Sequence, residues 1–160
     1  GEGIEICVET TLLGADSPTK IAQAILQIFP EFPIPENCPE PVLGKGSNYH
    51  WKATKVDLTH YLKLLHNQRI LDTALDSMCK NLEGRTTSFE LTRQAAMVGK
   101  IAFPLPNDIP LGGVISVTLT SDDLGDWLEA ATWHSGRDKV PRSIGDEKTM
   151  EEDGKAATWV

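Results

Sequence analysis

The sequence lacks any hydrophobic stretch long enough to cross a membrane, and it lacks the features of a secretory signal peptide. A membrane helix needs about 18 or more consecutive apolar residues, and no run in the chain approaches that length. Residues 1–15 contain three glutamates and no lysine or arginine, whereas a signal peptide begins with a basic segment. We therefore expect a cytoplasmic protein that does not contact a membrane.

Cysteines are too few and too widely spaced to hold a small fold together. Cys7, Cys38 and Cys79 fit neither a paired disulfide framework nor the Cys-x-x-Cys spacing of a zinc site. Cys7 and Cys79 lie in apolar patterns and are expected to be small buried hydrophobic residues. A chain of 160 residues can bury a sufficient core without disulfides or metal.

Motifs for catalysis and metal binding are also missing. The chain contains no HExxH, P-loop, GxGxxG or GxSxG motif. His60 and His66 are six residues apart, which places them on different sides of a helix and argues against a shared metal. Asp122, Asp123 and Asp126 form a carboxylate cluster, which the start of a helix explains. We therefore predict a protein that is not an enzyme and that holds no cofactor and no metal.

Charge is distributed unevenly along the chain. The formal net charge is −8, but residues 45–100 hold nine Lys and Arg against five Asp and Glu. The segments 1–44 and 101–160 each have a net charge of −6. A local positive excess in an acidic chain favours a polyanionic partner at that segment, although an excess of this size also arises by chance.

Hydrophobic periodicity predicts the element order β-α-β-α-β-β-β-α. Alternation of apolar and polar residues predicts strands at residues 4–13, 48–56, 86–91, 98–103 and 114–120. One helix is expected after Ser17, a capping residue followed by proline. A long helix is expected from Leu58 to Leu82, where apolar residues recur every three or four positions. A last helix should follow Ser121, and the Pro-rich segment 30–41 should be an extended surface connection.

Three consecutive strands near the end favour a mostly antiparallel or mixed sheet. We therefore predict a single α+β domain over residues 1–133, with helices packed on one face of the sheet. The stripe of the long helix is expected to pack on this sheet rather than to form a coiled coil, because it lasts only about three heptads. Residues 134–160 are charged and Gly-rich, and they are expected to form a C-terminal tail docked on its own or a neighbouring subunit.

The densest signature is the segment 84–101. Residues 92–97 within it must form a turn or a short helical bridge between two predicted strands. This bridge is expected to project Arg93 and Gln94, with Lys100 close by. Arginine and a planar amide suit contacts to phosphates and base edges. The alternative is that Arg93 and Gln94 hydrogen-bond loop carbonyls and fix the turn.

Three runs of the sequence resemble an uncharacterised archaeal protein family, UPF0201. They are LLHNQRILDTALDSM at residues 64–78, LEGRTTSFELTRQAAMVGKIAF at 82–103 and PLGGVISVTL at 110–119. The matched order covers roughly residues 4–131. The resemblance implies a fold similar to that of large-subunit ribosomal protein L5 and a place among predicted RNA-binding proteins. The family commonly has Asn-Lys where this chain has Thr92-Arg93, so Arg93 keeps the positive charge. The family commonly has Arg where this chain has Leu75, so a positive charge is lost there.

The local charge and the resemblance together lead to one main hypothesis, non-enzymatic binding of RNA or a ribonucleoprotein. The predicted contact residues are Lys52, Lys55, Lys63, Arg69, Arg93, Gln94 and Lys100. Such binding must weaken steeply with salt. The alternative is a homodimeric interaction or scaffold protein without a nucleic-acid role, which would use exposed strand edges and the tail. A hydrolase or nuclease built on the aspartate cluster is a distant third.

Overall fold

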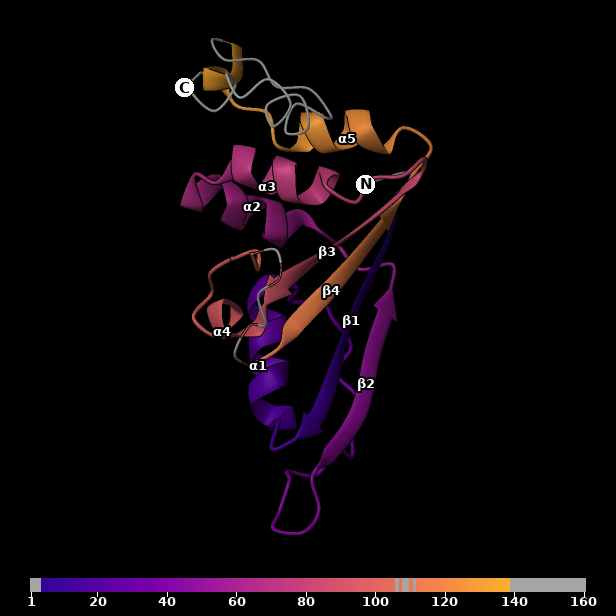
Figure 1. Cartoon of the computed structure of the whole chain (residues 1–160), viewed down its shortest axis with the longest axis vertical. Coiled ribbons are helices and arrows are strands. Elements are labelled where there is room, and N and C mark those ends of the chain that lie inside the picture. The colour runs from indigo at the N-terminus through magenta and orange to yellow at the C-terminus, as the bar shows by residue number, and fades with distance from the viewer. Residues whose placement is uncertain (1–3, 106, 108–109, 111, 139–160) are drawn as a thin grey trace.

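Four strands form one antiparallel sheet in the order β2-β1-β4-β3 in the computed structural model, which describes residues 4–105, 107, 110 and 112–138. The strands are β1 (Glu5–Gly14), β2 (Ser47–Thr54), β3 (Thr86–Thr92) and β4 (Val114–Thr120). The helices are α1 (Pro18–Ile28), α2 (Thr59–Gln68), α3 (Leu71–Cys79), α4 (Arg93–Ala96) and α5 (Leu124–Ala131), followed by the 3-10 helix η1 (Ser135–Asp138). The predicted α+β class and antiparallel sheet are confirmed (Figure 1).

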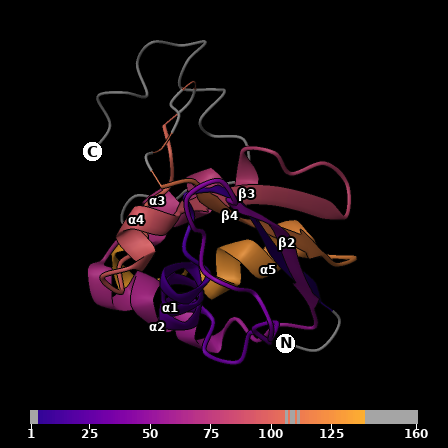
Figure 2. The same cartoon turned by 90° about the horizontal axis from the view of Figure 1, so that it is seen from below.

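Helices cover one face of the sheet, and no described helix packs on the other. Alternation along each strand produces this difference. In β1, Val8 and Leu12 are fully buried, whereas Glu9 is half-buried and Thr11 exposed on the opposite face. Figure 2 shows α1, α2 and α4 on one side of the strands, and α5 packs on α3. We call the covered face the inner face and the other the outer face.

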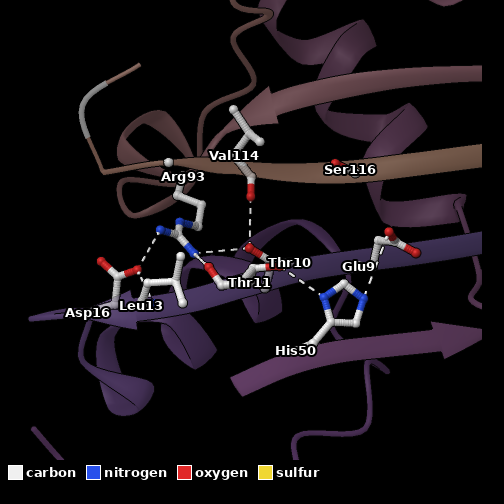
Figure 3. A pocket seen from close by; sticks show the side chains of 10 residues that line it. Glu9, Thr10, Thr11, Leu13, Asp16, His50, Arg93, Val114 and Ser116 are labelled. Atoms are coloured by element: carbon white, nitrogen blue, oxygen red, sulfur yellow. Dashed lines mark hydrogen bonds and ion pairs between the residues drawn. The ribbon is translucent and has the colours of Figure 1, made fainter. Parts of the chain in front are cut away.

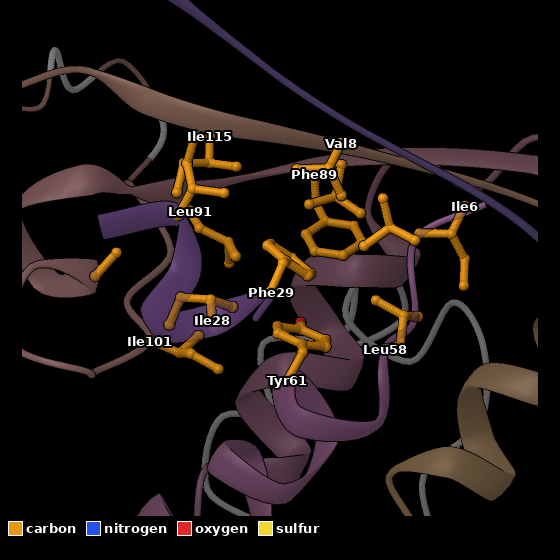
Figure 4. Close-up of a cluster of buried hydrophobic side chains, with 14 of the residues drawn as sticks. Ile6, Val8, Ile28, Phe29, Leu58, Tyr61, Phe89, Leu91, Ile101 and Ile115 are labelled. Carbon is orange, nitrogen blue, oxygen red and sulfur yellow. The ribbon is translucent and has the colours of Figure 1, made fainter. Parts of the chain in front are cut away.

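Aromatic rings join the inner face to the helices. Phe29 at the end of α1, Tyr61 of α2 and Phe89 of β3 follow one another with centroid distances of 6.0 and 6.1 Å (Figure 4). The Tyr61 hydroxyl lies 3.5 Å from the sulfur of Met78 in α3, and burial raises the pKa of this phenol. Aromatic pairs of this kind add about 0.5–1.5 kcal/mol to the effect of burial. The stack therefore fixes three helices on one strand.

The long helix predicted from Leu58 to Leu82 is wrong, because the structure has two helices there. α2 ends at Gln68, since Arg69 adopts the left-handed conformation with φ of 57°, and a residue in this conformation ends a helix. The Gln68 side chain donates to the carbonyl of Ile101 at 3.1 Å and accepts from its amide at 2.8 Å. The apolar stripe continues across the break because both helices bury it in the same core.

The strand predicted at residues 98–103 is also wrong. The helical bridge predicted at 92–97 is confirmed as α4, with Thr92 as its capping residue. The chain beyond it does not continue as a strand, because both backbone groups of Ile101 bond to the side chain of Gln68. A polar side chain thus takes the hydrogen bonds that a neighbouring strand would have made.

Other predicted elements are confirmed. Ser17 caps α1 by accepting a hydrogen bond from an amide in its first turn. The last helix, α5, follows Ser121 as predicted, and Asp123 occupies its N-cap position without a side-chain hydrogen bond to the helix. The Pro-rich segment 30–41 contains no helix or strand, although Phe32 within it is 3% exposed and enters the core. This connection is therefore anchored to the core at one point.

The first residue of the predicted tail is bound to the domain. Nε2 of His134 lies 3.0 Å from Oδ1 of Asp72 in α3, and η1 follows. The remainder of the predicted tail, 139–160, lies outside the described residues, and so does its predicted docking.

Cys7, Cys38 and Cys79 are half-buried thiols, so Cys7 and Cys79 are less buried than predicted. Among the described helices, none combines the length and the apolar character that a bilayer crossing requires.

Candidate nucleic-acid interface

Arg93 is buried, whereas the sequence predicted that α4 projects it outward. Its side chain is 5% exposed. The guanidinium donates hydrogen bonds to Oγ1 of Thr10 at 3.0 Å, to the carbonyl of Thr11 at 2.8 Å and to Oδ2 of Asp16 at 3.1 Å (Figure 3). It also donates to the carbonyl of Gly112. Four of its five N–H donors are therefore used inside the protein. The structure favours the alternative interpretation, in which Arg93 fixes the turn.

Contacts of Arg93 join four parts of the chain. They connect α4 to the end of β1, to the turn before α1 and to the turn before β4. The backbone amide of Arg93 also donates to the carbonyl of Gly113 at 3.1 Å. Gly113 has a φ of 80°, and a Cβ at this position would collide with the guanidinium. Arg93 is thus a structural residue that requires a glycine beside it.

A hollow of about 300 Å³ opens on the outer face beside Arg93. Within it, Oγ1 of Thr11 lies 2.9 Å from Nδ1 of His50, and Nε2 of His50 lies 3.9 Å from Oε1 of Glu9. This order of groups has the form of a hydrolytic triad, but the distance to the carboxylate exceeds a hydrogen bond and the imidazole is 53% exposed. Thr11 and His50 are direct partners across β1 and β2, which explains their contact without catalysis.

The aspartate cluster at the start of α5 is explained by an ion pair and by the position of its members at the helix start. Asp122 forms an ion pair with Arg85 at 2.8 Å, Asp123 occupies the N-cap position without a side-chain hydrogen bond to the helix, and Asp126 lies in the first turn. In the part of the chain that the structure describes, no three His, Cys, Asp or Glu side chains are arranged to hold a metal ion. The hydrolase or nuclease built on this cluster therefore stays an untested hypothesis.

The remaining predicted contact residues lie on two sides of the molecule. Lys52 is exposed on the outer face of β2, where it pairs across the strands with Glu9. Lys55 follows β2 in the left-handed conformation. The others, which lie on the helical side and are all exposed, are Lys63, Arg69, Gln94 and Lys100.

The helical side is built from three segments without acidic residues. Residues 17–30, 58–71 and 91–105 contain no Asp and no Glu. Helix α1 packs against both α2 and α4. The hydrogen bonds between Gln68 and Ile101 hold the end of α2 against the chain that follows α4. Segments that are far apart in sequence thus form one surface without carboxylates of their own. The carboxylate of Glu40 reaches its rim, where it accepts hydrogen bonds from Ser17 and Thr19.

Lys20 of α1 also belongs to this surface, and the sequence reasoning missed it. It lines a hollow of about 340 Å³ between α1 and α4 together with Gln94 and Met97. Asp16 reaches the same hollow, but its carboxylate is paired with Arg93. Lys20 was missed because it lies outside the basic segment 45–100, and only the packing of α1 on α4 brings it near.

We define the helical basic surface as six exposed residues of these three segments. They are Lys20, Lys63, His66, Arg69, Gln94 and Lys100. Within the described residues, none of its four lysine and arginine side chains forms an ion pair with a carboxylate. Their charge is therefore available to a partner.

Relatives of the chain are known by sequence. A UPF0201 protein of Sulfurisphaera tokodaii is 35% identical over 133 residues, which cover 80% of this chain and 88% of that protein. A UPF0201 protein of Methanothermobacter thermautotrophicus is 28% identical over 142 residues, covering 89% of this chain and 98% of that protein. A scan against models of known protein families finds no match.

Comparison with solved structures leads to the same group of proteins as the comparison of sequences. The crystal structure of a UPF0201 protein from Methanococcus jannaschii matches with a TM-score of 0.66 and 26% identity, covering 81% of this chain and 99% of that one. A crystal structure of another UPF0201 protein matches with a TM-score of 0.60 and 29% identity, covering 78% of this chain and 90% of that one. The chain belongs to the UPF0201 family of archaeal proteins.

Proposed function

We propose that the protein is a non-enzymatic RNA-binding protein of the cytoplasm, which contacts RNA or a ribonucleoprotein through the helical basic surface. The observation that carries this proposal is the packing of three segments without acidic residues into one surface, in a chain whose net charge is −8. A chain of this net charge repels polyanions in general. Binding therefore requires a local surface whose own segments contribute no carboxylates.

The kind of RNA follows from the side chains on this surface. Binding of single strands relies on exposed aromatic rings on which bases stack. In the three segments, Phe29 and Tyr61 are buried and Phe103 is half-buried. Apart from the exposed imidazole of His66, the surface carries cations without stacking rings, and such cations suit the phosphate backbone of a folded RNA. The similarity in fold to ribosomal protein L5, which the sequence resemblance implies, belongs to the same proposal.

A titration with a structured RNA tests the proposal. Binding is expected at low salt, with an affinity that falls as salt rises. Four phosphate contacts give a slope of about −3.6 in a plot of log K against log salt concentration. The double variant Lys63→Glu, Lys100→Glu should weaken binding strongly. The matched control Lys52→Glu, Lys55→Glu, which reverses the same number of charges away from this surface, should weaken it much less. Failure of the unmodified chain to bind at about 50 mM salt would refute the proposal.

The second candidate is a homodimeric scaffold without a nucleic-acid role. One observation favours it: β2 is an edge strand of eight residues, and no described strand pairs with its outer side. Such edges invite pairing with a second chain, although Lys52 on the strand opposes it. Light scattering at high protein concentration separates the two candidates, since a monomer there eliminates the scaffold.

A further inference from the structure

A hollow of about 750 Å³ lies beside β3, away from the helical basic surface. It extends from the exposed flank of α3, through Ser77 and Lys80, to the outer face at Ser88 and Ser116. The loop at residues 103–105 forms another wall. Its volume is in the range of about 300–1,000 Å³ that is typical of ligand sites. It therefore has room for several residues of a peptide.

The free edge of β3 faces this hollow. In an antiparallel edge strand, the backbone groups of alternate residues point away from the paired neighbour. Thr86 exchanges both of its backbone hydrogen bonds with Glu83 at 2.9 and 3.2 Å, so Thr86 points away from β4. The register with β4 is continuous, and Ser88, Glu90 and Thr92 therefore point the same way.

Both ends of this edge are already occupied. The carbonyl of Ser88 accepts from Nδ2 of Asn81 at 2.9 Å, and the amide of Thr92 donates to the carbonyl of Ala102 at 2.9 Å. Between these bonds, the amide of Ser88 and both backbone groups of Glu90 have no partner within the described part of the chain. These groups span about 7 Å, which suits about three residues of an added strand.

Side chains around the hollow indicate the chemistry of the occupant. The carboxylates of Glu9, Asp76 and Glu90 line it against a single lysine, Lys80. Phe103 and Leu105 add apolar surface, and Leu105 is 71% exposed. The walls are therefore suited to a partner with positive and apolar side chains, and they are unsuited to RNA.

We propose that this hollow binds a short extended peptide in which basic and apolar residues alternate, and that the peptide adds to the sheet beside β3. One peptide residue exchanges two hydrogen bonds with the backbone of Glu90, and its neighbour two positions away accepts from the amide of Ser88. Main-chain bonds supply affinity in this mode of recognition, while alternate side chains supply specificity. The proposal is independent of RNA binding, because the two surfaces share no residue.

An NMR titration of the ¹⁵N-labelled full chain tests the proposal. The probe is a pool of acetylated hexapeptides with Lys or Arg at alternate positions and Val, Leu or Ile between them. A matched pool carries Glu in place of Lys and Arg. The basic pool should shift the amides of Ser88 and Glu90 and slow their hydrogen exchange about tenfold, and the acidic pool should not. No shift at about 1 mM peptide, or equal shifts with both pools, would overturn the proposal.

Two further measurements separate strand addition from charge attraction. The best hexapeptide is resynthesised with N-methyl groups on its odd or on its even residues. Only one of these sets faces β3, so one peptide should lose about tenfold in affinity, about the effect of one hydrogen bond, and the other should not. Equal affinities would exclude strand addition. Glu90→Lys should weaken binding of the basic pool more than the control Glu5→Lys, an exposed residue outside the hollow.

A second copy of the chain is the competing occupant of the edge. The unliganded protein could be a dimer in which the amides of Ser88 and Glu90 are already protected from exchange. In that case the free edge of β3 pairs with a second copy of the chain, and the peptide proposal is wrong.

Discussion

Replacing Arg93 removes the contacts that join four parts of the chain. In Arg93→Ala, the carbonyls of Thr11 and Gly112 and the carboxylate of Asp16 each lose a donor. Breaking a buried charged pair costs about 3–5 kcal/mol. Because the Asp16 side chain is 29% exposed, water can solvate part of it, and we expect a loss of about 3 kcal/mol in the free energy of unfolding.

Urea unfolding measures this loss. A chain of this size has an m value of about 1–3 kcal/mol/M, so the midpoint should fall by about 1–3 M urea. Gln94→Ala is the matched control, since this exposed neighbour on the same helix should change stability by less than about 0.5 kcal/mol. Arg93→Lys should remain clearly destabilised, because an ammonium cannot reproduce the planar fork of donors.

A cycle with Asp16→Asn tests the coupling directly. The two sites should be non-additive by about 1 kcal/mol or more, as expected for contacting charged groups. The reasoning fails if Arg93→Ala unfolds within about 1 kcal/mol of the unmodified chain. It also fails if the variant keeps its stability but loses RNA affinity as strongly as the double variant at Lys63 and Lys100.

Four other predictions concern single sites. Gly113→Ala should cost about 1–3 kcal/mol, because of its φ of 80° and the adjacent guanidinium; a melting temperature equal to that of the unmodified chain would contradict this. Gln68→Ala should cost about 1–3 kcal/mol for two hydrogen bonds and speed hydrogen exchange at Ile101, and unchanged exchange there would argue against it. Hydrogen bonds from Thr59 hold the pKa of Asp57 below its usual value, so its contribution to stability is present above pH of about 4 and is lost as pH falls through the lower folded pKa; an NMR titration giving an ordinary value would refute this. Burial raises the pKa of the Cys7 thiol, so alkylation near neutral pH should be slower than for an unfolded peptide, and equal rates would exclude it.

The fold could be predicted where a pattern is local. β1 and β4 were found because each buries one side, so apolar and polar residues alternate within the strand itself. The errors occurred where a distant side chain determines the backbone. Residues 98–103 are apolar enough for a strand, but the partner of Ile101 is a side chain 33 residues away. Arg69 in a left-handed conformation leaves no mark on the helical periodicity around it.

The candidate site shows the same limit. The sequence identified Arg93 as a notable residue, but its partners Thr10 and Asp16 are 83 and 77 residues away, so its burial could not be read from the segment around it. Lys20 was missed for the converse reason, because a single lysine in an apolar helix has no signal until α1 packs on α4. Counting charges along the sequence identified the basic segment 45–100. It did not identify the helical basic surface, which also includes Lys20 from outside that segment.

The position of β4 has a consequence for synthesis of the protein. β4 lies between β1 and β3 in the sheet, yet it is the last of the four strands along the chain. While the ribosome translates the segment between β3 and β4, β1 can pair only with β2, and β3 has no neighbour. At about 5–20 residues per second, this state lasts one to several seconds in each round of synthesis. The nascent chain therefore passes through a stage in which β3 is unpaired and one edge of β1 is open, and its yield should depend on chaperones that act before residue 120 emerges.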